Sequence, residues 1–360
     1  MKTLLLGDIS PTPETAPYFK EKNIPELFND TVSIFEEKDF VFVNLECALT
    51  EHDGDIKKFG PALKAPVETA DVLKELGVTC CGLSNNHIFD YGIKGAKDTI
   101  KALENAAISY TGFGNDYEDS RNNLVFELNG EKICIIAVCE HEYSYALPDR
   151  IGSRPFDEYD TIEDIRNAKA HSDRVIVLYH GGKEMCQYPS PRLYKLCHAM
   201  ARNGADVVIC QHSHCIGAYE KYNDCHILYG QGNFHFGESL KEEIWNTSLA
   251  VEYDTESNEI SFIPLKAKGN GIVFVEKEEK KHLLSEFNLR NESLLNGEWK
   301  KGWHDFCEVK KDRYLQSIAA AALPDSSEKD NAKFAHYLDC EAHTDVWREL
   351  FPTYNLTNEK

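Results

Sequence analysis

The sequence contains a series of short apolar runs, and several of them end in polar residues of the kinds that bind metal ions. In the clearest case, residues 207–210 form an apolar run that leads into Gln211, His212, Ser213 and His214. Side chains at positions i and i+2 of an extended chain point the same way. We therefore expect a buried strand that presents His212 and His214 to one point just beyond its end.

Four earlier runs repeat this arrangement. Residues 4–6 lead to Asp8, residues 41–43 to Glu46, residues 78–83 to Asn86 and His87, and residues 175–178 to His180. Helical patterns at residues 66–76, 95–107, 161–170 and 191–203 alternate with the runs. Such alternation predicts a layered α/β fold, in which ligands gather at the carboxyl ends of the strands.

Further elements follow from turn signals and from changes in composition. The pair Asn129-Gly130 between apolar runs at residues 124–128 and 132–138 predicts a β-hairpin. We also expect a helix at residues 25–37 and strands at residues 226–229, 248–253 and 259–265. After about Glu276 the chain becomes rich in Lys and Glu with helical patterns. These features predict one domain over residues 1–275 and a helical C-terminal segment over residues 276–360.

The composition limits the partners and the location of the protein. A formal net charge of −21 disfavours binding to nucleic acid or to an anionic membrane surface. We find no apolar run long enough for a membrane span or a signal-peptide core, so we expect a cytoplasmic location. The twelve cysteines form no CxxC pair, and most lie in apolar runs, which predicts buried reduced thiols.

The polar residues at the five strand ends supply two carboxylates, one Asn and several His side chains. Nitrogen and oxygen donors in this mixture suit Mn, Fe or Zn, and their number suits two divalent ions about 3.5–4 Å apart. Such ions activate water for attack on a phosphoryl or acyl group. His87 directly follows Asn86 and is placed to act as a general acid with Asp90 orienting it, while Lys183 offers positive charge to an anionic substrate.

Each candidate also has an ordinary structural explanation. The two carboxylates could cap the helices that follow them, Asn86 could be a turn residue, and His180 could bond a backbone group in a Gly-rich loop. Five strand ends that all carry ligand-type residues favour one shared site over five separate coincidences. His141 and Glu142 also follow a strand, and we expect them to line the same pocket.

Six motifs occur in order over about residues 3–240. They are Gly7-Asp8, Asn44-Leu45-Glu46, Asn85-Asn86-His87 with Phe89-Asp90-Tyr91-Gly92, His180-Gly181-Gly182-Lys183-Glu184, His212-Ser213-His214 with Glu220, and Gly232-Asn233-Phe234. This set resembles the CapA family of poly-gamma-glutamate capsule biosynthesis proteins, which is similar to the calcineurin-like metallophosphoesterases. The resemblance implies a four-layer αββα sandwich, with two sheets inside and helices outside, to which this chain adds its helical C-terminal segment.

The resemblance also implies roles for particular residues. It implies two divalent ions, the first bound by Asp8 and His214, the second by Asn86, His180 and His212, with Glu46 as the bridge. It further implies His87 as the acid. We expect Asp90 to complete the catalytic pair, and we expect substrate contacts from Lys183, Glu184, Glu220 and Asn233. Two positions differ from the phosphoesterases, because Ser10 stands where they usually have a His ligand and Glu46 where they have Asp.

These observations lead us to expect a CapA-like metal-dependent hydrolase that cleaves a phosphoester or a glutamyl-type amide with metal-activated water. The expected partner is an anionic small molecule or a polyglutamate-type substrate. One alternative is a non-catalytic accessory protein in poly-gamma-glutamate synthesis or export. A further alternative is a phosphodiesterase or nucleotidase that acts on small metabolites.

Overall fold

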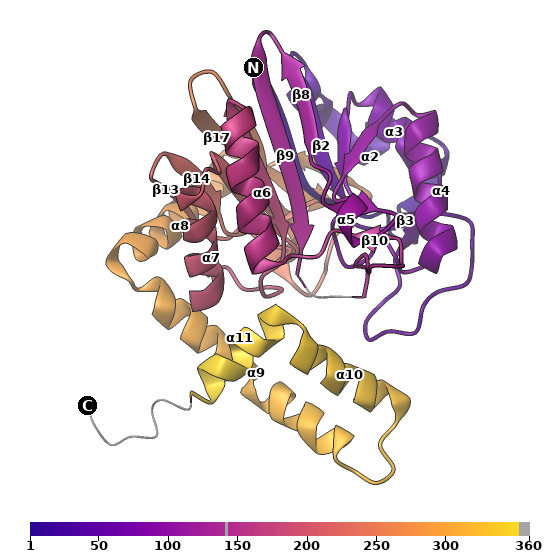
Figure 1. The fold of residues 1–360 in the computed structure, drawn as a ribbon, viewed down its shortest axis with the longest axis vertical. Helices are drawn as coiled ribbons and strands as arrows, with labels where there is room; N and C mark the ends of the chain where they lie inside the picture. Colours follow the sequence, from indigo (N-terminus) through magenta and orange to yellow (C-terminus); the bar gives the residue numbers. More distant parts are fainter. Residues whose placement is uncertain (141–142, 353–360) are drawn as a thin grey trace.

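A computed structural model describes residues 1–140 and 143–352, and two β-sheets form its centre (Figure 1). The first sheet has the order β18-β17-β16-β1-β2-β5-β6, and β15 also pairs with β1. Its parallel strands are β1 (Lys2–Ile9), β2 (Phe40–Leu45), β5 (Cys80–Gly82), β6 (Ser109–Thr111) and β15 (Asn233–His235). Its antiparallel strands are β16 (Thr247–Asp254), β17 (Glu259–Lys268) and β18 (Gly271–Phe274).

The second sheet has the order β13-β14-β12-β11-β9-β8. Its four inner strands are parallel: β14 (Cys225–Leu228), β12 (Val207–Gln211), β11 (Arg174–His180) and β9 (Glu131–Cys139). Antiparallel strands β13 (Tyr219–Tyr222) and β8 (Leu124–Leu128) close its two edges. Two short ribbons lie apart from the sheets, β3 (Ala48–Leu49) with β4 (Lys64–Ala65) and β7 (Phe113–Gly114) with β10 (Gly152–Ser153).

Alternate residues of the central strands enter different apolar cores, and this pattern defines the layers. In β1, Leu5 packs between the two sheets, whereas Leu4 and Leu6 pack on the outer side of the first sheet. In β11, Ile176 faces the inter-sheet core and Val177 faces the outer side of the second sheet. Both faces of these central strands are therefore buried, which is why they read as continuous apolar runs in the sequence.

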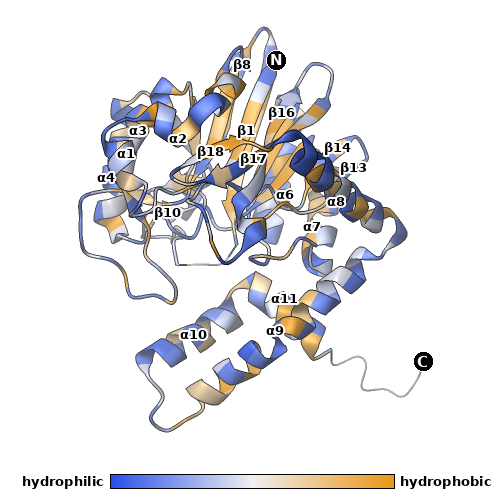
Figure 2. Cartoon of the chain, turned by 180° about the vertical axis from the view of Figure 1, so that it is seen from behind, coloured by the Kyte–Doolittle hydropathy of each residue, from blue (hydrophilic) through white to orange (hydrophobic). Residues whose placement is uncertain are grey.

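Helices cover the two outer faces, and the predicted αββα order of layers is confirmed. On the first sheet lie α1 (Ala16–Lys20), α2 (Ile24–Phe28), α3 (Thr69–Glu75) and α4 (Gly92–Asn105), and on the second lie α6 (Glu158–His171) and α7 (Pro191–Arg202). The remaining short helices are α5 (Tyr117–Ser120) and the 3-10 helices η1 (Asn29–Phe35) and η2 (Glu243–Asn246). Figure 2 shows apolar residues concentrated in the strands and hydrophilic residues on the outer helices.

The structure confirms some local predictions and corrects others. Asn129 and Gly130 have φ values of 56° and 79° and join antiparallel β8 and β9, as a hairpin turn of this type requires. All twelve cysteines are buried, as predicted. The single helix predicted at residues 25–37 is wrong, because α2 ends where Asn29 adopts a φ of 48°, outside the helical range, and a 3-10 helix follows.

Four helices form the C-terminal part of the described chain: α8 (Lys277–Asn296), α9 (Trp299–Ala321), α10 (Glu328–Asp339) and α11 (Glu341–Leu350). Figure 1 shows α9, α10 and α11 as a lobe below the sandwich. This lobe has its own apolar core, which includes Trp303, Tyr314 and Val346 and is joined by Cys186 from the sandwich. The division of the chain at residue 275 into two domains stays a prediction. Among the described residues, we find no helix with the length and apolar character needed to cross a membrane.

A network of buried hydrogen bonds and ion pairs connects the C-terminal lobe to the sandwich. Asp345 of α11 accepts hydrogen bonds from Arg192 Nε at 2.9 Å and from Ser190 Oγ at 2.6 Å. Arg192 also pairs with Glu140, whose other carboxylate oxygen accepts a hydrogen bond from the backbone N of Gly182 at 2.9 Å. The network thus links α11 to the loop that follows His180.

Replacing Asp345 with Ala is expected to loosen the lobe, because Arg192 loses a buried partner. Arg192 keeps Glu140 as a partner, so the loss of its charge-assisted hydrogen bonds to Asp345 is expected to cost about 1.5–3 kcal/mol of unfolding free energy. Urea unfolding measures this loss, and limited proteolysis is expected to cut first between the sandwich and α11. Asp339→Ala, at an exposed position at the end of α10, is the matched control. An Asp345→Ala protein as stable as this control would contradict the anchoring role.

Candidate metal centre

The predicted metal ligands lie where strands of both sheets end. Asp8 is near the end of β1, Glu46 directly follows β2, and His180 is the last residue of β11. All six predicted ligands are at most 7% exposed: Asp8, Glu46, Asn86, His180, His212 and His214. Buried polar side chains require partners, so their contacts with one another indicate what the site is built to hold.

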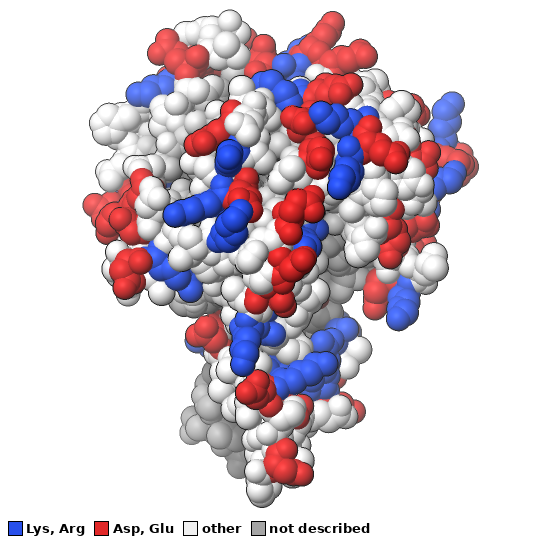
Figure 3. Space-filling model, turned by 90° about the vertical axis from the view of Figure 1, so that its right-hand side faces the viewer, with Lys and Arg blue, Asp and Glu red and all other residues white. Residues whose placement is uncertain are grey.

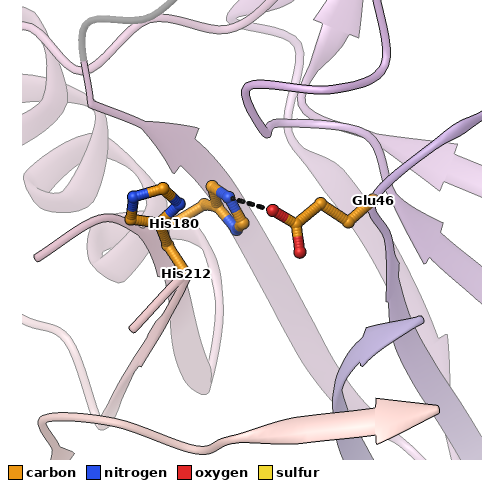
Figure 4. Close-up of side chains that lie close together, drawn as sticks. All are labelled: Glu46, His180 and His212. Atoms are coloured by element: carbon orange, nitrogen blue, oxygen red, sulfur yellow. Dashed lines mark ion pairs between the residues drawn. The ribbon is translucent and has the colours of Figure 1, made fainter. Parts of the chain in front are cut away.

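His180 contacts ligand candidates from the first sheet. Its Nε2 lies 2.9 Å from Oδ1 of Asn86 and 3.3 Å from Oε1 of Glu46. Figure 4 shows Glu46 and His180 facing each other, with His212 beside them, and the ring centroids of His180 and His212 are 4.9 Å apart. The contact joins residues from the two sheets, so the site depends on their packing.

Asp8 and His214 form the other half of the cluster. Oδ2 of Asp8 accepts a hydrogen bond from the backbone N of His212 at 3.0 Å and lies 3.6 Å from Nδ1 of His214. That same Nδ1 is 2.8 Å from Oδ1 of Asn233. Asn233, which we expected to contact substrate, is therefore a buried residue that positions the ring of His214.

Two trios of residues have potential ligand atoms within 4.8 Å of one another. One trio is Glu46, His180 and His212, and the other is Asp8, Glu46 and His214. Glu46 belongs to both, which is the arrangement a carboxylate bridge between two ions requires. The assignment of each residue to a particular ion stays a proposal.

Glu46 is the most informative member of the cluster. Its side chain is fully buried, and among the described residues neither carboxylate oxygen has a hydrogen-bond partner. Burial raises the pKa of Glu46, and it raises the pKa of Asp8 to about 6. Burial also lowers the pKa of His180 to about 4. A bound cation would favour both the ionised carboxylates and the neutral histidine.

The pKa of His214 shifts in the opposite direction from the pKa of His180. Burial works against its charged form, but the nearby carboxylates of Glu46 and Asp8 outweigh this effect and raise its pKa. The donor set, the orphaned oxygens of Glu46 and the burial together fit divalent metal ions bound by nitrogen and oxygen ligands.

The two histidines of the HxH motif reach the site by a different route from the one we predicted. Strand β12 ends at Gln211, and His212 and His214 have φ values of 75° and 54°. Both lie in the left-handed region, which is costly for residues other than glycine and is concentrated at functional sites. The expectation of an extended strand end is therefore wrong, although both rings do reach the cluster.

Sequence reasoning missed one residue that organises the cluster. Nδ2 of Asn44 donates to Oδ1 of Asp8 at 2.7 Å and lies 3.1 Å from Nδ1 of His180. Asn44 stands two residues before Glu46 in the same motif, and this proximity was a usable signal. Gly7 is needed beside Asp8, because a Cβ at this position would lie 2.0 Å from the carbonyl oxygen of Gly232.

The predicted catalytic pair forms a hydrogen-bonded unit at the edge of the cluster. Nδ1 of His87 lies 2.6 Å from Oδ2 of Asp90, and Lys58 Nζ lies 3.1 Å from the same nitrogen and also pairs with Asp90. Burial and the neighbouring Lys58 lower the pKa of His87. Because Nδ1 is engaged, Nε2 is the nitrogen left for a reacting group. Lys58 lies in a loop with no recognisable pattern and was not predicted.

A cavity of about 180 Å³ lies beside the cluster and is lined by Asn86, His87 and His212. Four basic side chains also line it, against the two acidic ones of Glu184 and Glu242. The basic residues are Lys58, Lys183, Lys310 and Arg313. Figure 3 shows basic side chains gathered where the C-terminal lobe meets the sandwich. The cavity is thus locally basic in a chain whose net charge is −21.

The remaining predicted residues divide into two groups. Lys183 and Glu184 line the cavity and lie 3.5 Å apart as an ion pair. Glu220 lies on β13, where its Oε1 is 2.7 Å from both His198 Nε2 and the hydroxyl of Tyr229. The structure therefore gives Glu220 structural partners and does not bring it to the cavity. His141 and Glu142 lie outside the described residues.

The layers and the buried His–carboxylate cluster define a four-layer αββα sandwich with a candidate metal centre. The chain belongs to the family described as bacterial capsule synthesis protein PGA_cap, which matches residues 2–238. Residues after 238, including all of α8 to α11, lie outside this match.

Two curated relatives carry the name CapA. The chain is 33% identical over 202 residues to the capsule biosynthesis protein CapA of Bacillus anthracis, a match that spans 54% of this chain and about half, 49%, of that protein. It is 28% identical over 262 residues to the PGA biosynthesis protein CapA of Bacillus subtilis (strain 168), covering 70% of this chain and 67% of that protein.

Among solved structures, a hypothetical protein from Thermus thermophilus has a TM-score of 0.48 and 15% identity. The match covers 74% of this chain and 100% of that one. The TM-score and the identity both indicate a weak similarity between the two structures.

Proposed function

We propose that this protein is a metal-dependent hydrolase that cleaves a phosphoester or a glutamyl-type amide in an anionic substrate. The observation that carries the proposal is Glu46, a fully buried carboxylate for which the described residues provide no hydrogen-bond partner, placed between two sets of metal-ligand candidates. A buried carboxylate that accepts no hydrogen bond is costly to ionise, so a bound cation is the simplest reason for its position.

Under this proposal, Asp8 and His214 would hold one divalent ion and Asn86, His180 and His212 the other, with Glu46 shared between them. Bound ions of this kind lower the pKa of water and stabilise negative charge on the group that is cleaved. Asn44 and Asn233 would keep the ligand side chains oriented through their hydrogen bonds to Asp8 and His214.

The other residues of the site would bind the substrate and move a proton. Asp90 and Lys58 fix the ring of His87 through Nδ1, which leaves Nε2 to carry a proton to the leaving group. Lys183 would attract the anionic part of the substrate into the cavity. The name of the Bacillus subtilis relative, PGA biosynthesis protein CapA, supports a glutamyl polymer or its precursor as the substrate.

A hydrolysis screen tests the proposal. Purified protein is offered a nitrophenyl phosphomonoester, a nitrophenyl phosphodiester and a γ-glutamyl nitroanilide. We expect turnover of at least one class, at least tenfold loss of that turnover after chelation, and recovery on adding back Mn, Fe or Zn. Hydrolysis that is indifferent to chelation, or no hydrolysis by metal-loaded protein, would contradict it.

Ser10 favours a second candidate function, that of an accessory protein in polyglutamate synthesis or export without catalysis. This residue is buried beside β1 at the position where phosphoesterases usually have a third ligand, so one ion would have fewer protein ligands. An accessory protein would bind polyglutamate at physiological salt and show no turnover in the screen, even with metal bound.

A further inference from the structure

The cavity beside the metal cluster has two walls, and the second wall comes from the C-terminal lobe. Asn86, His87 and His212 of the sandwich line one side, and Lys310 and Arg313 of α9 contribute to the other. Helix α9 lies outside the part of the chain that the family match covers. The lobe is therefore a component of this site that the family motifs do not describe.

Lys310 and Arg313 form no ion pair with a carboxylate in the described part of the chain, although Glu184 and Glu242 line the same cavity. They lie three residues apart on α9, on the same side of the helix. Neither forms an ion pair there, whereas Lys301 and Lys311 of the same helix pair with Asp305 and Glu308. Two unpaired cations at a cavity of a strongly acidic protein favour an anionic ligand.

A second cavity of about 950 Å³ continues from the first, between residues 55–60 and α10. Lys58, Phe59, Tyr143 and His336 line both cavities. The first cavity alone is smaller than the usual site for a small organic molecule. Together the two cavities provide room for an elongated substrate with one end at the metal cluster.

We propose that Lys310 and Arg313 form an anion-binding subsite that holds a second charged group of a chain-like polyanion whose end group lies at the metal cluster. The inference rests on the proposed hydrolase function and adds to it a second binding site for a charged group of the substrate. It makes the protein selective for short or terminal segments that carry at least two anionic groups, and it gives the C-terminal lobe a role in substrate recognition.

Binding of γ-linked glutamate oligomers tests the subsite. Affinities of the 360-residue protein, as purified, are measured by calorimetry for glutamate and for its γ-linked trimer at constant ionic strength. We expect the trimer to bind at least about tenfold more tightly than the monomer, as one added charge-assisted contact provides. In Lys310→Ala/Arg313→Ala this preference is expected to fall to less than about threefold.

Lys300→Ala/Lys301→Ala is the matched control, because it removes the same charge from exposed positions on the same helix. This control is expected to keep the preference for the trimer. Equal preference in the Lys310→Ala/Arg313→Ala protein, or no preference in metal-loaded wild type, would overturn the subsite. Metal content, measured on every sample, separates the two proposals, since a wild-type protein without metal would contradict the hydrolase function itself.

Discussion

Replacing Glu46 with Gln is expected to abolish metal binding and to make the protein's stability insensitive to chelators. In wild type, bound ions at about a thousand times their dissociation constant stabilise the fold by about 4 kcal/mol, so chelation should lower the melting temperature by roughly 5–10 °C. The variant lacks the shared ligand and should melt at the same temperature with and without chelator.

With metal bound, wild type is expected to be more stable than the Glu46→Gln variant. Without metal, this order should be reversed. Glu46 is buried, and no described residue offers a hydrogen bond to either oxygen, so its negative charge is poorly stabilised when no cation is bound. Gln removes that charge, and the metal-free variant is therefore expected to be at least as stable as metal-free wild type. Glu51→Gln, the same substitution at an exposed position nearby, is the control. A Glu46→Gln protein that chelators still destabilise would show that the cluster is not the metal site.

Replacing His87 with Ala is expected to lower turnover by about 10²–10⁴-fold, the usual contribution of a positioned general acid or base. The ring lines the cavity and its Nδ1 is held by Asp90 and Lys58, so the variant loses the group that carries the proton without losing a predicted metal ligand. Metal content is therefore expected to stay at the wild-type level, and steady-state kinetics on the substrate found in the screen measures the change.

His198 provides a matched control for this variant. It forms another His–carboxylate pair, with Glu220, and does not line the cavity. His198→Ala should keep turnover within a few-fold of wild type when the folded protein is compared at equal concentration. Full turnover by His87→Ala would remove the proposed acid from the mechanism.

The central strands and the clustering of the candidate ligands were predictable because the two patterns reinforce each other. Strands such as β11 are buried on both faces, so residues 175–178 read as an unbroken apolar run whose end is marked by His180. Parallel strands that end at one edge then bring their terminal polar residues together. Asp8, Glu46 and His180 could be placed this way without knowledge of side-chain packing.

Other features depend on tertiary contacts that no local pattern contains. The left-handed conformations of His212 and His214 arise in a loop after β12, where the sequence suggested a continuing strand. Glu220 follows the HxH motif closely in the sequence, yet β13 directs its side chain to His198. Helical periodicity predicted a helix in the region of α9 but not which side of it would face the cavity, so Lys310 could not be assigned.

The most direct test of the metal centre is the metal content of protein purified without tags or chelators, measured by plasma mass spectrometry beside Glu46→Gln. We predict about one to two equivalents of Mn, Fe or Zn per wild-type chain, and less than about a tenth of that amount in the variant. Wild-type protein that binds no divalent metal, even after incubation with each ion, would contradict the metal centre and the hydrolase function that rests on it.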